Sequence, residues 1–274
     1  MYLKHDGEPE TVIILKHKIC CRSKIRFERI IKGNTLATFI LVHGAWHNGE
    51  HLEVLADHIR NSGNEVFLPT LVGNRENDDK STGLEEAISS LLDFIENREL
   101  SDFILVGHSY AGMIITGIAD RAPALVRRLI YWNAFVPLDG ESLNDLVPES
   151  FLNLWSEVLK PDGSVLLPYA VWRDRFINDA TTALALSTFK SLNSQPLKTF
   201  SDKISLTRNP SEITIPKAYI NATEDTCFPH AMNWHPRLSE KLGFFRLIQL
   251  PGSHEVCFTN PSLLAKKIML GAED

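Results

Sequence analysis

The sequence predicts an α/β fold: a mostly parallel central sheet, helices on both of its faces, and a helical insertion. Three observations predict this fold. Short apolar runs, as expected for strands buried on both faces, alternate with helical patterns along most of the chain. The alternation stops once, over residues 137–210, and then resumes. The 274 residues are 44% hydrophobic and 23% charged, which is ordinary globular composition with enough apolar material for one large core.

Before the insertion, each predicted strand is a short apolar run, and each predicted helix is amphipathic or built of small residues. The predicted strands are Thr38–Val42, 65–69, 103–106 and 129–135. The predicted helices are 52–59, which Gly63 ends, 84–95 and 111–119. After the insertion the sequence predicts a strand over 215–221, a helix over 231–241, a strand over 244–250 and a closing helix over 262–270. Residues 38–136 and 211–274 therefore form the predicted core, whose β-α-β order makes the sheet parallel.

Residues 1–37 differ from the rest and are predicted to form an N-terminal extension. An apolar run over 12–15 is followed by a basic stretch that begins at Lys16. Two short strands, over 11–19 and 24–31, would pair as a hairpin. A flexible extension is the alternative.

Charge, hydropathy and cysteine usage exclude several classes of protein. The net charge of −6 and the isoelectric point near 5.9 do not fit the basic face of a nucleic-acid binder. No apolar run approaches the roughly 18 residues that span a bilayer, and no secretory signal is visible. The four cysteines, Cys20, Cys21, Cys227 and Cys257, lack the C-x-x-C spacing of a zinc ribbon. We expect a cytoplasmic protein with reduced thiols that binds neither nucleic acid nor membrane.

The strongest local signal is the hexapeptide Gly107-His108-Ser109-Tyr110-Ala111-Gly112, which lies between an apolar strand and a small-residue helix. This is the context of the nucleophile elbow, G-x-S-x-G, in which a tight turn lifts the serine hydroxyl above the sheet. The fifth position is Ala111, and the glycine follows one residue later. The pattern predicts that Ser109 is a nucleophile.

A serine nucleophile needs a general base, and the base needs an orienting acid. In proteins with such an elbow the acid follows the serine in the chain, and the histidine comes last. Glu224 and Asp225 follow the strand predicted over 215–221, and His254 follows the strand over 244–250. We predict His254 as the base and Asp225 as the acid, with Glu224 as the alternative acid.

The tetrahedral intermediate of acyl transfer carries a negative oxygen that needs fixed hydrogen-bond donors. The residue after the nucleophile, Tyr110, offers one main-chain N–H, and the loop after the first central strand offers another at Ala45. His43 is expected to brace that loop. His47, His51 and His58 share one helix, but no carboxylate stands at ligand spacing, so we predict no metal site.

The insertion concentrates aromatic side chains among polar ones. It leaves and rejoins the sheet at the edge where the strands carry Ser109, Asp225 and His254, so we expect it to cover the site as a cap. Trp46, Trp155 and Trp172 are the predicted substrate-binding residues. The alternative is that the cap aromatics only pack a core.

The chain resembles the α/β-hydrolase superfamily over residues 38–270. The segments that carry the resemblance are Phe39-Ile40-Leu41-Val42-His43-Gly44-Ala45-Trp46, the elbow, Phe135-Val136-Pro137, Tyr219-Ile220 and Gly252-Ser253-His254. They are similar to the branch of small methyl esterases and hydroxynitrile lyases, and to bacterial salicylate-esterase-like hydrolases. The resemblance implies a cofactor-free enzyme with Ser109, Asp225 and His254 as a triad, Ala45 and Tyr110 as oxyanion donors, and a helical cap.

Two positions bear on the branch. The lyases that this chain resembles carry a threonine where Gly44 stands, and a lysine where Glu255 follows the histidine. A lysine would stabilise a cyanide leaving group and a glutamate would repel it, so the resemblance favours hydrolysis. We predict a serine carboxylesterase for small-molecule esters of apolar or aromatic acids, and a homodimer is one option for its assembly. The alternatives are a C–C or hydroxynitrile lyase, a cofactor-free oxygenase and a non-catalytic receptor.

Overall fold

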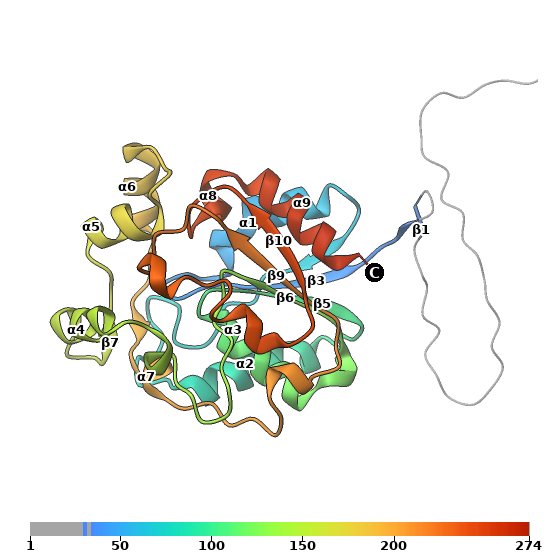
Figure 1. Ribbon diagram of the computed structural model, residues 1–274, viewed down its shortest axis with the longest axis horizontal. Coiled ribbons are helices and arrows are strands. Elements are labelled where there is room, and N and C mark those ends of the chain that lie inside the picture. Colours follow the sequence, from blue (N-terminus) through green and yellow to red (C-terminus); the bar gives the residue numbers. More distant parts are fainter. Residues whose placement is uncertain (1–29, 32–33, 274) are drawn as a thin grey trace, which may run out of the picture.

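The computed structural model describes residues 30–31 and 34–273, and its centre is one parallel sheet (Figure 1). Six strands run in the order β10-β9-β6-β5-β3-β4, and every neighbouring pair is parallel. The strands are β3 (Thr38–Val42), β4 (Glu65–Phe67), β5 (Phe103–His108), β6 (Val126–Trp132), β9 (Lys217–Ala222) and β10 (Arg246–Leu250). The predicted α/β fold is confirmed.

Helices cover both faces of the sheet, because side chains of each central strand point alternately into two apolar clusters. In β3, Phe39 and Leu41 belong to one cluster, and Ile40 and Val42 belong to the other. The first cluster is closed by α1 (Glu53–Arg60), α8 (Val256–Thr259) and α9 (Pro261–Ala272). The second is closed by α2 (Leu84–Asn97) and α3 (Ala111–Arg121), on the opposite side of the sheet in Figure 1.

The helix predicted over 231–241 is wrong. The chain there forms only two short 3₁₀ turns, η6 (His230–Met232) and η7 (Ser239–Leu242). A continuous helix would need an N–H at position 236 to bond the carbonyl of Met232, and Pro236 has none. That carbonyl accepts a 3.1 Å hydrogen bond from Nε of Arg237 instead.

The strand predicted over 129–135 lies three residues earlier in the structure. β6 pairs with β5 from Val126 to Trp132, and the next residue, Asn133, has a φ of 38°. That left-handed conformation ends the extended chain, and asparagine is among the residues that adopt it at low cost. The polypeptide therefore leaves the sheet at Asn133.

The segment between β6 and β9 is mainly helical, as the sequence predicts, and it adds a two-stranded antiparallel ladder that the sequence does not. Its helical elements are η3 (Asn144–Leu146), α4 (Glu149–Val158), α5 (Tyr169–Val171), the π-helical turn η4 (Trp172–Phe176), α6 (Thr182–Lys190), α7 (Lys198–Ser201) and η5 (Pro210–Glu212). The ladder pairs β7 (Ser164–Val165) with β8 (Gln195–Pro196). Figure 1 shows α4, α5 and α6 together beyond one end of the sheet. We call residues 137–210 the inserted segment.

Four shorter elements complete the described chain: the 3₁₀ turns η1 (Gly49–Leu52) and η2 (Pro123–Leu125), and the strands β1 (Ile30–Ile31) and β2 (Asn34–Thr35), which pair as a small ladder. The predicted hairpin over 11–19 and 24–31 lies outside the described residues, apart from Ile30–Ile31. Across residues 30–31 and 34–273, no helix combines the length and apolarity that a bilayer crossing requires.

Candidate active site

The elbow around Ser109 is formed as predicted, and the structure explains its spacing. Ser109 stands between β5 and α3 with a φ of 53°, in the left-handed region. The turn there is tight, so the residues on either side of Ser109 pack closely against neighbouring chain. A Cβ on Gly107 would lie 2.9 Å from Cδ1 of Ile115, and one on Gly112 would collide with the main chain of Phe135. Glycine is therefore required at 112 and favoured at 107, and the offset from G-x-S-x-G follows from packing of Gly112 against Phe135.

Asp225 and His254 lie side by side at the ends of β9 and β10. Nδ1 of His254 is 2.6 Å from Oδ2 of Asp225, and the two side chains are 1% and 2% exposed. Oδ1 of the same carboxylate accepts a 2.7 Å hydrogen bond from the main-chain N–H of Cys227. Glu224, the alternative acid, is exposed, and its contacts are main-chain ones with Gly252 and Asn178. The geometry thus pairs Asp225, and not Glu224, with the histidine.

The environment of His254 favours its protonated form. Burial lowers the pKa of the imidazole, but the charge and hydrogen bond of Asp225 and the charge of Glu255 together raise it more, so the pKa lies above the ordinary 6.5. The ring stacks on Trp234 with centroids 5.1 Å apart, and it meets Phe176 edge-on. Nε2 has no hydrogen-bond partner among the described residues, so the ring nitrogen that a general base would use is free. A direct bond to Ser109 is not formed, and such bonds often tighten only when substrate binds.

Asn133 holds the carboxylate of Asp225, and sequence reasoning missed this role. Its Nδ2 donates to Oδ2 of Asp225, while its Oδ1 accepts a 2.7 Å hydrogen bond from the main-chain N–H of Ala222. Both contacts bridge from the end of β6 to the end of β9. The sequence placed Asn133 inside a strand, and the signal that could have found it is an asparagine directly after a buried apolar run.

Two main-chain N–H groups are available beside Ser109. Within the described part of the chain, the N–H groups of Ala45 and Tyr110 donate no hydrogen bond, and both residues line the same cavity as Ser109. The loop of Ala45 approaches closely because Gly44 lacks a side chain: a Cβ there would lie 2.8 Å from Nδ1 of His108 and 3.3 Å from Cβ of Ser109. Free donors at such a place can stabilise a developing oxyanion.

His43 braces this loop, as expected. Its Nδ1 donates to the carbonyl of Gly44 at 2.8 Å, and its Nε2 accepts from the main-chain N–H of Leu71 at 3.1 Å. Burial lowers the pKa of His43 to about 4, so the ring is neutral near pH 7. Both nitrogens are occupied in holding the chain.

Glu255 lies away from the cavity and faces His47. Its Oε2 is 3.5 Å from Nε2 of His47, and Sγ of Cys257 donates to the same oxygen at 3.6 Å. Burial raises the pKa of Glu255 to about 7. His47 in turn donates from Nδ1 to the carbonyl of Ala45 at 2.7 Å. The glutamate therefore neighbours the histidine that bonds the Ala45 loop, and it does not line the cavity around Ser109.

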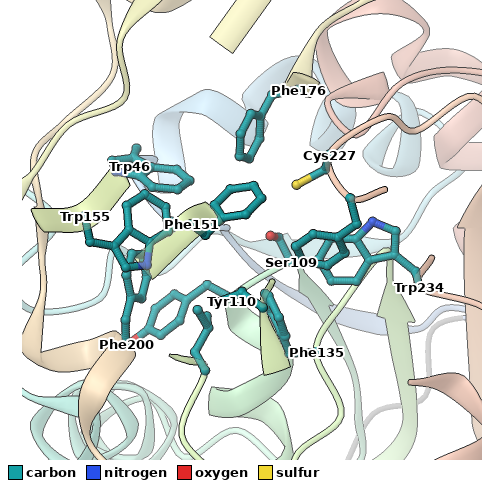
Figure 2. Close-up of a pocket in the computed structure, with 14 residues that line it drawn as sticks. Trp46, Ser109, Tyr110, Phe135, Phe151, Trp155, Phe176, Phe200, Cys227 and Trp234 are labelled. Atoms are coloured by element: carbon teal, nitrogen blue, oxygen red, sulfur yellow. The ribbon is translucent and has the colours of Figure 1, made fainter. Parts of the chain in front are cut away.

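The cavity above Ser109 is small and has a strongly aromatic lining. Figure 2 shows the Ser109 hydroxyl pointing into a space that rings surround on several sides. The lining residues are Ala45, Trp46, Ser109, Tyr110, Phe135, Leu143, Val147, Phe151, Trp155, Phe176, Phe200, Cys227, Phe228 and Trp234. None of these side chains carries a charge at pH 7, since burial raises the pKa values of Tyr110 and Cys227. The arrangement suits a neutral, apolar group next to a hydroxyl.

Two of the three predicted tryptophans line this cavity, and Trp172 does not. Trp46 and Trp155 lie next to each other in its wall, with ring centroids 5.7 Å apart. Trp172 is fully buried behind Phe176, on which it stacks, and its Nε1 donates to the carbonyl of Ala185 at 3.1 Å. The structure therefore places Trp172 in the core of the inserted segment. Sequence reasoning also missed Phe228 and Trp234, of which it placed only Trp234 in an element, the predicted helix over 231–241.

The expectation of no metal site concerned His47, His51 and His58. His47 and His51 meet edge to face at 5.1 Å, and each is hydrogen-bonded to main-chain carbonyls. Elsewhere in the described chain, two groups bring ligand atoms within 4.8 Å of one another, and both include His254. Nδ1 of His254 is already bonded to Asp225, so a metal ion there would compete with that pair.

Comparison with known proteins shows the family of this chain. A model of the alpha/beta hydrolase family matches residues 39–266. The chain is 31% identical over 252 residues to a carbendazim hydrolyzing esterase of Nocardioides sp. (strain SG-4G), covering 85% of this chain and 98% of that protein. It is 25% identical to Methylesterase 8 of Arabidopsis thaliana, covering 86% and 89%. Among solved structures, it matches an extracellular alpha/beta-hydrolase from a Paenibacillus species, described as sharing structural and functional homology with tobacco salicylic acid binding protein 2. That match has a TM-score of 0.83 and 31% identity, and it covers 87% of this chain and all of the other.

Proposed function

Because this chain belongs to the alpha/beta hydrolase family, we propose that it is a serine carboxylesterase that cleaves small esters of apolar or aromatic acids through an acyl-enzyme. The observation that carries the proposal is the cavity itself. A serine hydroxyl at a strand-to-helix elbow opens into an uncharged aromatic space that also holds two unpaired main-chain N–H groups. The buried pair of Asp225 and His254 supplies a base beside that space.

In the proposed reaction, Oγ of Ser109 attacks the ester carbonyl and its proton passes to Nε2 of His254. The negative oxygen of the tetrahedral intermediate accepts hydrogen bonds from the N–H groups of Ala45 and Tyr110. His254, held through Nδ1 by Asp225, then gives the proton to the departing alcohol. Water attacks the acyl-enzyme with His254 as base, and the acid leaves. The chain and water supply every group that these steps use.

The cavity supports the substrate class. Its lining is apolar apart from Ser109 and buried polar atoms of aromatic and thiol side chains, so it would desolvate a charged acid at a high cost. The space beside Ser109 is small, which favours small acyl groups over long chains. The names of the esterase relatives support ester hydrolysis. A cyanide-releasing lyase would need a cation near the leaving group, and no described residue of the lining supplies one.

We further propose that the inserted segment, residues 137–210, is a cap that selects the acyl group. Six of the lining residues come from it: Leu143, Val147, Phe151, Trp155, Phe176 and Phe200. Together they form the wall opposite the elbow, so an acyl group bound to Ser109 would contact them. The location in the cytoplasm and a homodimeric state stay proposals. Free thiols at Cys227 and Cys257 support a reducing compartment, although the similar Paenibacillus protein is described as extracellular.

The acyl preference tests the proposed function directly. We expect p-nitrophenyl benzoate and hexanoate to exceed the acetate in kcat/KM by about 100-fold, because burying a ring-sized group in the cavity is worth a few kcal/mol. Trp155→Phe removes about 40 Å² of the wall and should lower the benzoate-to-acetate ratio roughly fivefold. Trp172→Phe is the matched control, because its ring lies outside the cavity, and it should leave the ratio unchanged. Equal rates across the ester series would contradict acyl selection.

The pH dependence of kcat/KM tests the base. His254 acts only when Nε2 is unprotonated, so the rate should fall as the pH drops through the pKa of this residue. That pKa is raised above the ordinary 6.5 by Asp225, so the acid limb should have its midpoint above 6.5. The profile is measured with a p-nitrophenyl ester, whose ester group does not titrate, and the melting temperature is followed at each pH. A midpoint below 6.5 in a folded enzyme would argue against the coupling of His254 to Asp225.

A further inference from the structure

Trp46, the residue next to the proposed oxyanion donor Ala45, is held by the inserted segment through all of its polar groups. Its main-chain N–H donates to Oε1 of Gln195 at 3.0 Å, and its carbonyl accepts from the N–H of Asn193 at 2.7 Å. Its indole Nε1 donates to the carbonyl of Val165 at 3.2 Å. These contacts join distant parts of the chain, because Gln195 lies 149 residues and Val165 lies 119 residues after Trp46.

The backbone of Trp46 needs such support. Its φ is 64°, in the left-handed region that costs a bulky residue free energy and persists only where the surroundings impose it. The turn directs the N–H of Trp46 to Gln195, while the N–H of Ala45, one residue earlier, stays unpaired at the cavity. If the backbone of Trp46 relaxed to a common conformation, the peptide planes next to Ala45 and Trp46 would rotate. The N–H of Ala45 would then change its direction relative to Ser109.

Gln195 is itself fixed by buried partners. Its Oε1 also accepts from Nδ2 of Asn74 at 2.7 Å, and its Nε2 donates to Oγ1 of Thr199 at 2.8 Å. Gln195, Asn74 and Thr199 are all fully buried. Nδ2 of Asn74 donates as well to the carbonyl of His47 at 3.2 Å. One amide oxygen thus holds the Ala45 loop directly at Trp46 and, through Asn74, at His47.

We propose that Gln195 is a positioning residue for the oxyanion hole, so that the inserted segment completes the catalytic site as well as covering it. The inference rests on the proposed esterase function, and it assigns to Gln195 an effect on the transition state. The ground-state fit of the acyl group depends on the aromatic wall, which Gln195 does not line. Loss of the amide should therefore lower kcat and leave KM nearly unchanged.

The test is Gln195→Met, which keeps the length of the side chain and removes both its acceptor and its donor. Removing one oxyanion donor outright costs about 10²–10³ in kcat, so misdirecting one should cost roughly 10–100-fold, with KM within about threefold of wild type. Thr188→Val is the matched control. It likewise removes a buried polar group from the inserted segment, but among the described residues Oγ1 of Thr188 bonds only carbonyls of α6, so kcat should stay at the wild-type value.

Two inhibitors separate a role in the oxyanion hole from a merely structural one. A phenyl trifluoromethyl ketone forms a tetrahedral adduct with Ser109 and uses the oxyanion donors, whereas toluene, a neutral ring without a hydrogen-bond acceptor, reports on the cavity alone. We expect Gln195→Met to weaken binding of the ketone by the same factor as kcat and to leave the inhibition constant of toluene unchanged. A wild-type kcat in folded Gln195→Met, or an equal weakening of both ligands, would overturn the inference.

Further variants keep the outcome decisive. If Gln195→Met does not fold, Thr199→Val removes the partner of the amide Nε2 and should show the same pattern at smaller amplitude; no change in kcat and ketone affinity would overturn the proposal. Ser109→Ala is measured in the same series. Hydrolysis that does not depend on Ser109 would contradict the proposed function itself, whereas Ser109-dependent hydrolysis with no effect of Gln195→Met would contradict only the role of Gln195.

Discussion

Ser109→Ala is expected to lower kcat for p-nitrophenyl benzoate by about 10⁶, the scale seen when a serine hydrolase loses its nucleophile. The hydroxyl is the group that would form the acyl bond, and the remaining oxyanion donors would leave only a small residual rate. The fold should persist, because alanine occupies the same left-handed conformation with the same Cβ, and φ at this position is 53°. Activity is measured by single-turnover kinetics, and the melting temperature is the control for folding.

Cys227 is the rival nucleophile, since its thiol lines the same cavity. Burial raises the pKa of that thiol well above its ordinary value, so the reactive thiolate is scarce near neutral pH. A fluorophosphonate should therefore add to wild type at Ser109, as mass spectrometry of the labelled peptide would show, and should not add to Ser109→Ala. Substantial activity in folded Ser109→Ala, lost on alkylation by iodoacetamide, would instead identify Cys227 as the nucleophile.

Asp225→Asn should lower kcat by about 10⁴, the scale of losing the carboxylate that orients a catalytic histidine. An asparagine amide can present its NH₂ to Nδ1 of His254 and favour the wrong tautomer, and it cannot stabilise the imidazolium. The pKa of His254 should fall as well, because the carboxylate is the main group that raises it against the effect of burial. The acid limb of kcat/KM would then move to lower pH.

The neighbouring carboxylate provides the control for this variant. Glu224→Gln changes an exposed side chain that makes no contact with His254, so kcat should stay within about threefold of wild type. Both variants are compared at the pH optimum of wild type and at a second pH two units higher, where a lowered histidine pKa has no effect on protonation. A larger loss in Glu224→Gln than in Asp225→Asn would mean that the acid has been assigned to the wrong neighbour.

Several features were predictable because they depend on short stretches of chain. The alternation of apolar runs and amphipathic helices indicated the parallel sheet, and β3, β5 and α3 lie within a few residues of their predicted bounds. Ser109, Asp225 and His254 each follow a strand. Parallel strands end at one edge of a sheet, so their order alone brought the three to one place. The pairing of Asp225 with His254 agrees with that expectation, and their catalytic roles stay predictions.

The sheet, the elbow and the residues at the strand ends were predictable from the sequence, because apolar periodicity and turn chemistry act between near neighbours. Which aromatic residues face the cavity, and which polar groups hold the site, depends on how distant segments pack in the folded molecule. Trp155 and Trp172 look alike in sequence, yet one lines the cavity and the other packs behind Phe176. Asn133 and Gln195 act across 92 and 149 residues of chain, on Asp225 and Trp46. A hydrogen bond between such distant positions leaves no periodic trace in the sequence, because its geometry exists only once the sheet and the inserted segment have packed together.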